Sequence, residues 1–323
     1  MMHTCSADMH KRKAGVAALS IFSNSALVGL KLLVGLLMGS VSVLSEAIHS
    51  AVDLVASVIA FLSVRTSAKP ADARHPFGHG KYENLSGAIE ALLIFLAAIW
   101  IIYEAVHKLM APQPLEKAGI GVMVMMVSAI ANWLISGRLF KIGRETDSIA
   151  LQADAWHLRT DVYTSVGVMA GLAVIWGGYW LAPTWNLNWV DPVAALCVAV
   201  LILKAAWDLT TESVKDLLDA RLPEEEETWI MNFIRALCPM VQGLHDLRTR
   251  KGGAMRFVEF HLIVPEKLTV AEAHDISDKI EEAITARYPS THVTTHIEPC
   301  RRPCPETCLP GCFLTEEERK DKL

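Results

Sequence analysis

Two stretches of the sequence carry the same pattern: SEAIHSAVD at residues 45–53 and DAWHLRTD at residues 154–161. Each places a histidine four residues before an aspartate, His49 before Asp53 and His157 before Asp161. Four residues are about one turn of an α-helix, so the two side chains of each pair lie on one helix face. Both stretches lie inside apolar segments. Because ionisable side chains within a membrane are costly and usually functional, the two pairs are the first candidate site.

Outward from these stretches, roughly the first two-thirds of the chain contains six apolar segments. Of the 323 residues, 52% are apolar and only 20% are charged. A helix needs about 20 apolar residues to span a membrane, so we predict an α-helical membrane protein with six transmembrane helices. The segments lie near residues 14–37, 44–62, 85–106, 120–135, 149–176 and 190–207. The predicted transmembrane domain covers residues 14–210 and follows an N-terminal segment of residues 1–13.

Charge sets the expected orientation and excludes one class of partner. Ten lysines and arginines lie in the N-terminal segment and in the loops after the second and fourth spans, against two in the alternate loops. By the positive-inside tendency, both termini are cytoplasmic in a multi-pass protein of the cell (inner) membrane, surrounded by lipid. The net charge of −5 offers no basic surface for nucleic acid, so no such partner is expected.

Two facing spans would bring the pairs together as two imidazole nitrogens and two carboxylate oxygens. Four such ligands suit tetrahedral Zn²⁺ at about 2.0–2.2 Å. The structural alternative is a pair of buried hydrogen bonds between helices. Asp154, three residues before His157, is a possible accessory residue. It either orients that imidazole, lines the entrance of the site, or serves as a buried structural carboxylate.

The chain resembles the cation diffusion facilitator family, divalent-metal/proton antiporters with six spans and a cytoplasmic C-terminal domain. The resemblance extends from about residue 12 to residue 299, and it rests on the two pairs, on FGHGK at residues 77–81 and on Asp191-Pro192. It implies that the pairs form the transport site. Members with two His-x-x-x-Asp pairs are usually zinc transporters. The resemblance therefore implies export of Zn²⁺, with Cd²⁺ next, in exchange for protons, and neither an organic cofactor nor enzyme activity.

The loop after the second span, DARHPFGH at residues 72–79, holds a carboxylate and two imidazoles. The resemblance implies a second metal site here, because Asp72, His75 and His79 match the three ligands of bacterial members. Pro76 and Gly78 prevent a continuous helix, so the three residues lie on a shaped loop. The alternative is a solvated loop whose histidines touch phospholipid headgroups.

From about residue 211 the composition becomes that of a soluble domain. Acidic residues 224–227 favour a helix start through the helix dipole, and Gly252-Gly253 is a turn signal. The predicted elements are a helix at 224–237, strands at 246–251 and 256–264, a helix at 270–288 and a strand at 292–298. The order α-β-β-α-β predicts a small α+β cytoplasmic domain at residues 211–299.

The resemblance implies that this domain dimerises, so a homodimer is expected. It also implies a binuclear metal site formed by His245, His261, His274, His296 and Glu298. Glu298 stands where an aspartate is typical of the family, which keeps the charge and moves the carboxylate by one methylene. The alternative is that these histidines are ordinary surface residues.

Four cysteines recur every fourth residue in the tail, residues 300–323: Cys300, Cys304, Cys308 and Cys312. Intervening prolines exclude a helical stripe, and disulfides are disfavoured in a cytoplasmic segment. Four thiols suit soft cations, so the tail is a possible metal site. An unfolded extension explains the composition equally well, and both interpretations stay open.

Other functions that use metals or drive transport lack their motifs. No His-Glu-x-x-His pattern of a metalloprotease and no Gly-x-x-x-x-Gly-Lys-Ser/Thr loop of an ATP-driven pump occurs in the sequence. Two alternatives to zinc export remain. One is a transporter of Fe²⁺, Mn²⁺, Co²⁺ or Ni²⁺, and the other is a metal-sensing membrane scaffold with little flux.

Overall fold

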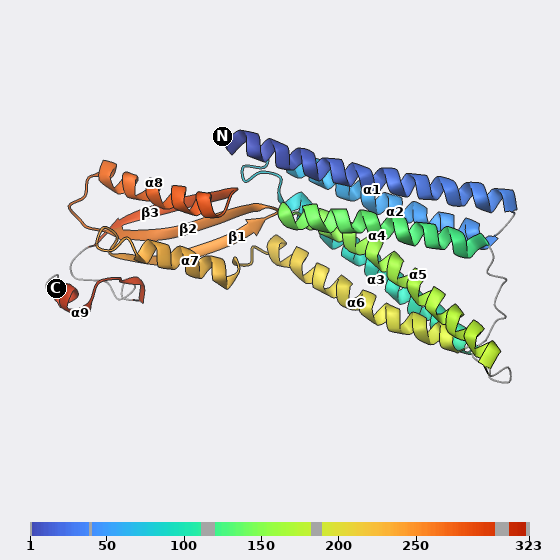
Figure 1. The fold of residues 1–323 in the computed structure, drawn as a ribbon. Helices are drawn as coiled ribbons and strands as arrows, with labels where there is room; N and C mark the ends of the chain where they lie inside the picture. The colour runs from blue at the N-terminus through green and yellow to red at the C-terminus, as the bar shows by residue number, and fades with distance from the viewer. Residues whose placement is uncertain (1, 39–40, 111–119, 182–188, 301–309, 321–323) are drawn as a thin grey trace. The chain divides into compact units, whose positions relative to one another are not determined.

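A computed structural model describes residues 2–38, 41–110, 120–181, 189–300 and 310–320. The chain divides into two compact units, residues 1–214 and residues 215–323. Six long helices form the first unit and run side by side (Figure 1). Their bounds are α1 Met2–Met38, α2 Val41–Ser67, α3 Lys81–Met110, α4 Ile120–Glu145, α5 Ile149–Leu181 and α6 Val190–Leu217.

Within the described residues, five of these helices are long and apolar enough to cross a membrane: α1, α2, α3, α4 and α6. The remaining helix, α5, has 33 residues and carries Asp154, Arg159 and Asp161 in its first half. Its position in the unit explains how it tolerates them. Helix α5 contributes buried residues to two apolar clusters, one shared with α1, α2 and α4 and the other with α3 and α6. Its charged residues are therefore surrounded largely by protein, where charge within a membrane is tolerated.

One buried ion pair ties the ends of several helices together. Lys13 of α1 donates to Glu83 of α3 at 3.1 Å, and both side chains are almost fully buried. Ser67, at the end of α2, donates to the same carboxylate at 2.6 Å, and Ser148, just before α5, also donates to it. Such a pair persists in a buried place only when further hydrogen bonds satisfy it, as the two serines do here.

The second unit has the predicted order α-β-β-α-β, followed by a short helix. Its elements are α7 Glu224–Arg235, β1 Gly243–Gly252, β2 Met255–Val264, α8 Val270–Arg287, β3 Thr291–Pro299 and α9 Glu316–Lys320. Strand β1 pairs antiparallel with β2, and β2 pairs parallel with β3. A parallel pair needs a crossover, and α8 provides it. Its start is fixed by a capping box between Thr269 and Glu272.

The core of this unit lies between the sheet and the two helices. Apolar residues of α7 and α8 pack on the even-numbered positions of β2, which include Val258, Phe260 and Leu262. Side chains alternate across a strand, so the odd-numbered positions of β2 point to the other face of the sheet. His261 lies on that face, which α7 and α8 leave uncovered.

Residues 310–320 of the tail are folded. This contradicts the alternative of an extension that is unfolded throughout. The backbone N–H of Phe313 donates to the carbonyl of Gln242 at 2.9 Å, and Cys312 forms a β-bridge with Gly243. Phe313 packs against the core cluster, and Leu314 is 6% exposed. The tail therefore returns to the first residues of β1.

Candidate metal sites

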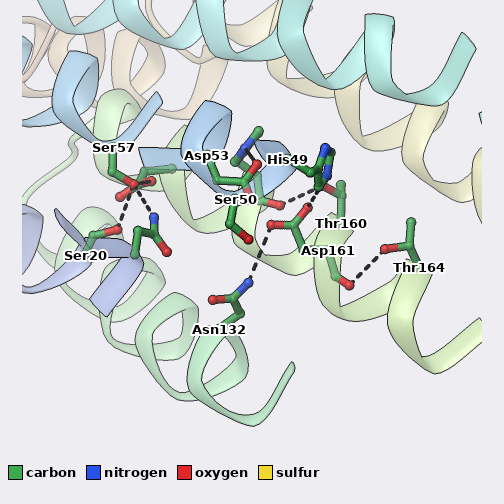
Figure 2. Close-up of polar contacts among 12 residues, drawn as sticks. Ser20, His49, Ser50, Asp53, Ser57, Asn132, Thr160, Asp161 and Thr164 are labelled. Carbon is green, nitrogen blue, oxygen red and sulfur yellow. Dashed lines mark hydrogen bonds and ion pairs between the residues drawn. The ribbon is translucent and has the colours of Figure 1, made fainter. Parts of the chain in front are cut away.

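The two histidine–aspartate pairs converge between α2 and α5. Nε2 of His157 lies 3.1 Å from Oδ1 of Asp53, and Nε2 of His49 lies 4.0 Å from Oδ1 of Asp161. Figure 2 shows His49, Asp53 and Asp161 pointing toward one another. One ligand atom from each of these three residues lies within 4.8 Å of the other two. Each histidine thus meets the aspartate of the other helix, as expected where two helices with the same pattern run antiparallel.

The four residues differ in exposure. The side chains of Asp53 and His157 are 7% exposed, whereas those of Asp161 and His49 are 20% and 58% exposed. Asp53 and His157 therefore form the buried part of the site, and His49 is its most exposed member. Nδ1 of His157 is buried and makes no hydrogen bond among the described residues, which leaves that nitrogen available.

Neighbouring polar side chains surround this cluster, and the repeated motif does not include them. Asn132 of α4 donates to Oδ2 of Asp161 at 3.5 Å, and Lys31 of α1 donates to Ser50 at 2.7 Å. Asn132 and Lys31 lie outside the repeated motif, so spacing alone gives no signal for them. Their only signal in the sequence is a polar residue within an apolar span.

Asp154 is fully buried and belongs to a serine network. Its Oδ1 accepts a hydrogen bond from Ser57 at 2.9 Å, and Ser57 in turn contacts Ser20 at 3.1 Å and accepts from Asn24 at 2.7 Å (Figure 2). Oδ2 of Asp154 has no hydrogen-bond partner among the described residues. The contacts of Asp154 thus run to α2 and α1 and not to the ring of His157.

The predicted loop residues also come together. Asp72 lies 3.5 Å from Nδ1 of His75 and 3.4 Å from Nε2 of His79, and one ligand atom of each residue falls within 4.8 Å of the others. Backbone N–H groups of His75 and Arg74 donate to the Asp72 carboxylate at 2.7 and 2.8 Å. These hydrogen bonds hold the pKa of Asp72 below its usual value, so the carboxylate is ionised at neutral pH. Gly78 has a φ of 83°, a left-handed conformation that lets the loop turn between the two histidines.

In the soluble unit, three histidines stand side by side across the sheet. His245 pairs with His261 and His261 pairs with His296 in the strand register. The carboxylate of Glu298 lies 3.3 Å from His245, 2.9 Å from His261 and 3.6 Å from His296. Burial raises the pKa of Glu298, but the hydrogen bonds and charges of His245 and His261 outweigh it and leave the pKa below its usual value.

Asp246 joins this cluster and was missed by sequence analysis. Its Oδ2 lies 3.4 Å from Nδ1 of His245 and 3.9 Å from Nδ1 of His261. Successive residues of a regular strand point to opposite faces, but the register shifts between His245 and Arg248, and Asp246 has a φ of 51°. This bulge brings Asp246 to the side of the histidines.

His274 lies apart from these contacts. Its side chain is 72% exposed on α8, where Nδ1 lies 3.7 Å from Asp278. Of the tail cysteines, Cys300 donates its backbone N–H to the carbonyl of Val264 at 2.8 Å and Cys312 forms a β-bridge with Gly243. Neither cysteine forms a disulfide with another described residue. Cys304 and Cys308 lie outside the described residues.

Comparisons with known proteins give matches to both units of the chain. Residues 17–218 match the profile of the cation efflux transmembrane domain, and residues 222–300 match that of the cation efflux protein cytoplasmic domain. An uncharacterized transporter of Synechocystis, sll1263, is 38% identical over 86% of this chain and 87% of its own length. The cation-efflux pump FieF of Klebsiella pneumoniae is 34% identical over 87% of this chain and 90% of its own length.

Among solved structures, the metal-bound C-terminal domain of the CzcD transporter from Thermotoga maritima is 26% identical. The match covers 25% of this chain and 99% of that one, with a TM-score of 0.23. The family profiles together span both units, and the full-length relatives exceed 30% identity. The chain is a multi-pass membrane protein and belongs to the cation diffusion facilitator family of cation-efflux transporters.

Proposed function

We propose that the protein exports Zn²⁺ from the cytoplasm, with Cd²⁺ as the next best substrate, and that protons move in the opposite direction. The observation that supports this most directly is the convergence of His49, Asp53, His157 and Asp161 from α2 and α5. Two imidazoles and two carboxylates are the ligand types and number that tetrahedral Zn²⁺ takes. The four residues therefore form the proposed transport site.

Competition for the ligands provides the proposed coupling. Zinc needs deprotonated ligands, so metal and protons compete for the same side chains. In a state open to the cytoplasm, neutral imidazoles bind the ion. In a state open to the outside, protons displace it and are carried inward as the helices rock around the site. We propose that the ion enters or leaves past His49, whose side chain is 58% exposed and is the most exposed of the four.

The proposal also covers the membrane topology, the assembly and two further metal sites. We propose that both termini are cytoplasmic, that the protein lies in the cell (inner) membrane and that it works as a homodimer through its soluble domain, residues 211–299. The match of residues 222–300 to the family's cytoplasmic domain supports the dimer. His245, His261, His296 and Glu298, with Asp246, form the proposed cytoplasmic metal site, which biases the transport cycle. Asp72, His75 and His79 form a further proposed site in the loop.

Flux measurements test this function. Purified protein in proteoliposomes, with an imposed pH gradient and a panel of Zn²⁺, Cd²⁺, Fe²⁺, Mn²⁺, Co²⁺ and Ni²⁺, should move zinc fastest. In molecules whose cytoplasmic side faces the outside of the vesicle, zinc should enter the vesicle while protons leave it. Faster transport of Fe²⁺ or Mn²⁺ would overturn the zinc assignment. Binding without flux of any ion would favour a metal-sensing scaffold.

A further inference from the structure

An open cavity of about 600 Å³ lies between α4 and α5 and shares no residue with the candidate metal sites. Helix α4 lines it with Gly137, Phe140, Lys141 and Arg144, and helix α5 lines it with Trp156, Arg159 and Tyr163. The spacing of three and four residues places each set on one face of its helix. Figure 1 shows the end of α4 close to the start of α5, from where the two helices diverge.

Three cationic side chains meet at this cavity without carboxylate partners among the described residues: Lys141, Arg144 and Arg159. Their polar and ring contacts are with uncharged groups. Arg159 donates to Ser136 at 2.9 Å and lies 3.6 Å above the Trp133 ring, and Arg144 lies 5.5 Å above the Phe140 ring. The adjacent carboxylate, Glu145, is paired with Arg12 at 2.7 Å. The cavity therefore carries uncompensated positive charge.

The remaining walls are aromatic, and the surface beside the cavity is apolar. Phe140 and Trp156 pack edge to face, with ring centroids 5.2 Å apart. One to three turns before the cavity, α4 exposes Val127, Ile130 and Leu134, whose exposed fractions are 48%, 55% and 61%. This part of α4 lies in a helix apolar enough to span a membrane. A charged pocket thus opens next to a surface suited to acyl chains.

We propose that this cavity binds the headgroup phosphate of an anionic diacyl lipid, with the acyl chains along the exposed apolar side chains of α4. Lysine and arginine donate charge-assisted hydrogen bonds to phosphate oxygens, and basic pockets between membrane helices suit anionic headgroups. A soluble phosphate would use the same cations but gain nothing from the apolar surface. The lipid would hold α4 against α5, the helix that carries His157 and Asp161.

Gly137 offers a way to close the cavity without removing charge. A Cβ placed there meets only the Arg159 guanidinium, at 4.0 Å, so Gly137→Ala fits. A leucine would extend further into the space that Gly137 leaves open. Gly137→Leu and the double change Lys141→Gln/Arg144→Gln are therefore independent ways to remove the proposed site, one by shape and the other by charge.

The experiment measures thermal unfolding of the full-length protein in a neutral detergent. Phosphatidylglycerol, phosphatidylcholine and glycerol 3-phosphate are each titrated. We expect phosphatidylglycerol to raise the Tm saturably and the other two to change it little. In both site variants the lipid should bind more weakly, so the half-saturating lipid concentration should rise by about tenfold or more. The matched control, Arg65→Gln/Arg138→Gln, also removes two exposed basic residues but leaves the cavity intact, and it should behave like the unchanged protein.

Several results would overturn the proposal. Equal shifts with phosphatidylcholine would mean that lipid contacts lack headgroup selectivity. An equal shift with glycerol 3-phosphate would mean that the cavity takes a soluble phosphate. A loss of response in the control variant as large as in the site variants would assign the effect to general surface charge. An unchanged response in Gly137→Leu, folded and melting as one transition, would place the lipid elsewhere.

Discussion

The ring of His157 on α5 faces the carboxylate of Asp53 on α2, with 3.1 Å between Nε2 and Oδ1. Both side chains are nearly buried, so this contact lies in the closed part of the proposed transport site. His49 and Asp161, 4.0 Å apart, form its more exposed part. A cation that binds between the four residues must replace the His157–Asp53 contact with bonds to both, which ties metal binding to the relative position of α2 and α5.

Removing either carboxylate should abolish transport. Asp53→Ala and Asp161→Ala each leave three proposed ligands, so zinc flux in proteoliposomes should fall to background while the protein still inserts in the membrane. Glu104→Ala removes an exposed carboxylate that pairs with Lys108 at 3.3 Å, and it serves as the control with normal flux. Normal zinc flux in both aspartate variants would contradict the assignment of the transport site.

Changing one ligand type should change the ion preference. His49→Asp replaces a nitrogen ligand with a harder oxygen ligand, which suits Mn²⁺ and Fe²⁺ better relative to Zn²⁺. The ratio of zinc flux to manganese flux should fall, measured on the same vesicle preparation. If the ratio does not move, selectivity is set by residues other than His49.

Zinc should stabilise the soluble unit by linkage. Binding at a hundredfold excess over the Kd adds about 2.7 kcal/mol, so a fragment of residues 215–323, which contains its own apolar core, should melt higher with Zn²⁺ than with chelator. The shift should shrink in His261→Ala/His296→Ala. It should also shrink on acidification, because protonated imidazoles do not bind metal.

Two single variants serve as a control and as a further test of the zinc-dependent Tm shift. His292→Ala changes a histidine four residues before His296 on the same strand and face, and it should leave the zinc shift intact. His274→Ala tests the one predicted ligand that lies apart from the cluster in this structure. A zinc shift that survives His261→Ala/His296→Ala would contradict the assignment of the site.

Acid should remove the contribution of Glu298 to the stability of the metal-free fold. Its pKa in the folded state lies below the usual value of 4.5, so the ionised carboxylate stabilises the fold at pH values above about 4.5. The contribution is lost as the pH falls through the folded-state pKa. In chelator, Glu298→Gln should lower the Tm of the fragment at pH 6 and approach the unchanged protein at the lowest pH values. A Tm difference that stays constant with pH would contradict this account.

Adding one methyl group at Gly311 should displace the docked tail and destabilise the soluble unit. A Cβ on Gly311 would lie 2.0 Å from the carbonyl oxygen of Leu244, so Gly311→Ala must displace the tail segment. Overpacking of this kind costs about 1–3 kcal/mol, and the melting transition of the soluble unit should move to lower temperature. Gly29→Ala, where a Cβ has no neighbour within 4 Å, is the control. Equal Tm values in the two variants would mean that the tail is not held as described.

Local signals explain why much of this structure could be predicted from the sequence. The elements of the soluble unit have clear local signals, such as Gly252-Gly253 between the antiparallel strands and the acidic residues 224–227 at the start of α7. The four proposed transport ligands were found because their pattern repeats within two spans. Each of these features depends on residues a few positions apart.

The parts that could not be predicted depend on long-range contacts. Asp246 reaches the histidines only because of a bulge in β1, and strand periodicity predicts the opposite face for it. The docking of Phe313 depends on a surface about seventy residues earlier in the chain, near Gln242. The central position of α5 also has no local signal, since it arises from packing against helices on both sides.

The returning tail has a consequence for the solubility of shortened proteins. Strand β1 is at one edge of the three-stranded sheet, and an edge strand offers unpaired N–H and C=O groups to other chains. The bridge between Cys312 and Gly243 and the bond from Phe313 to Gln242 occupy the beginning of that edge. A protein that ends before Gly311 exposes these backbone groups together with the apolar surface that Phe313 covers. Such a protein should aggregate through β1 even where its metal sites are complete.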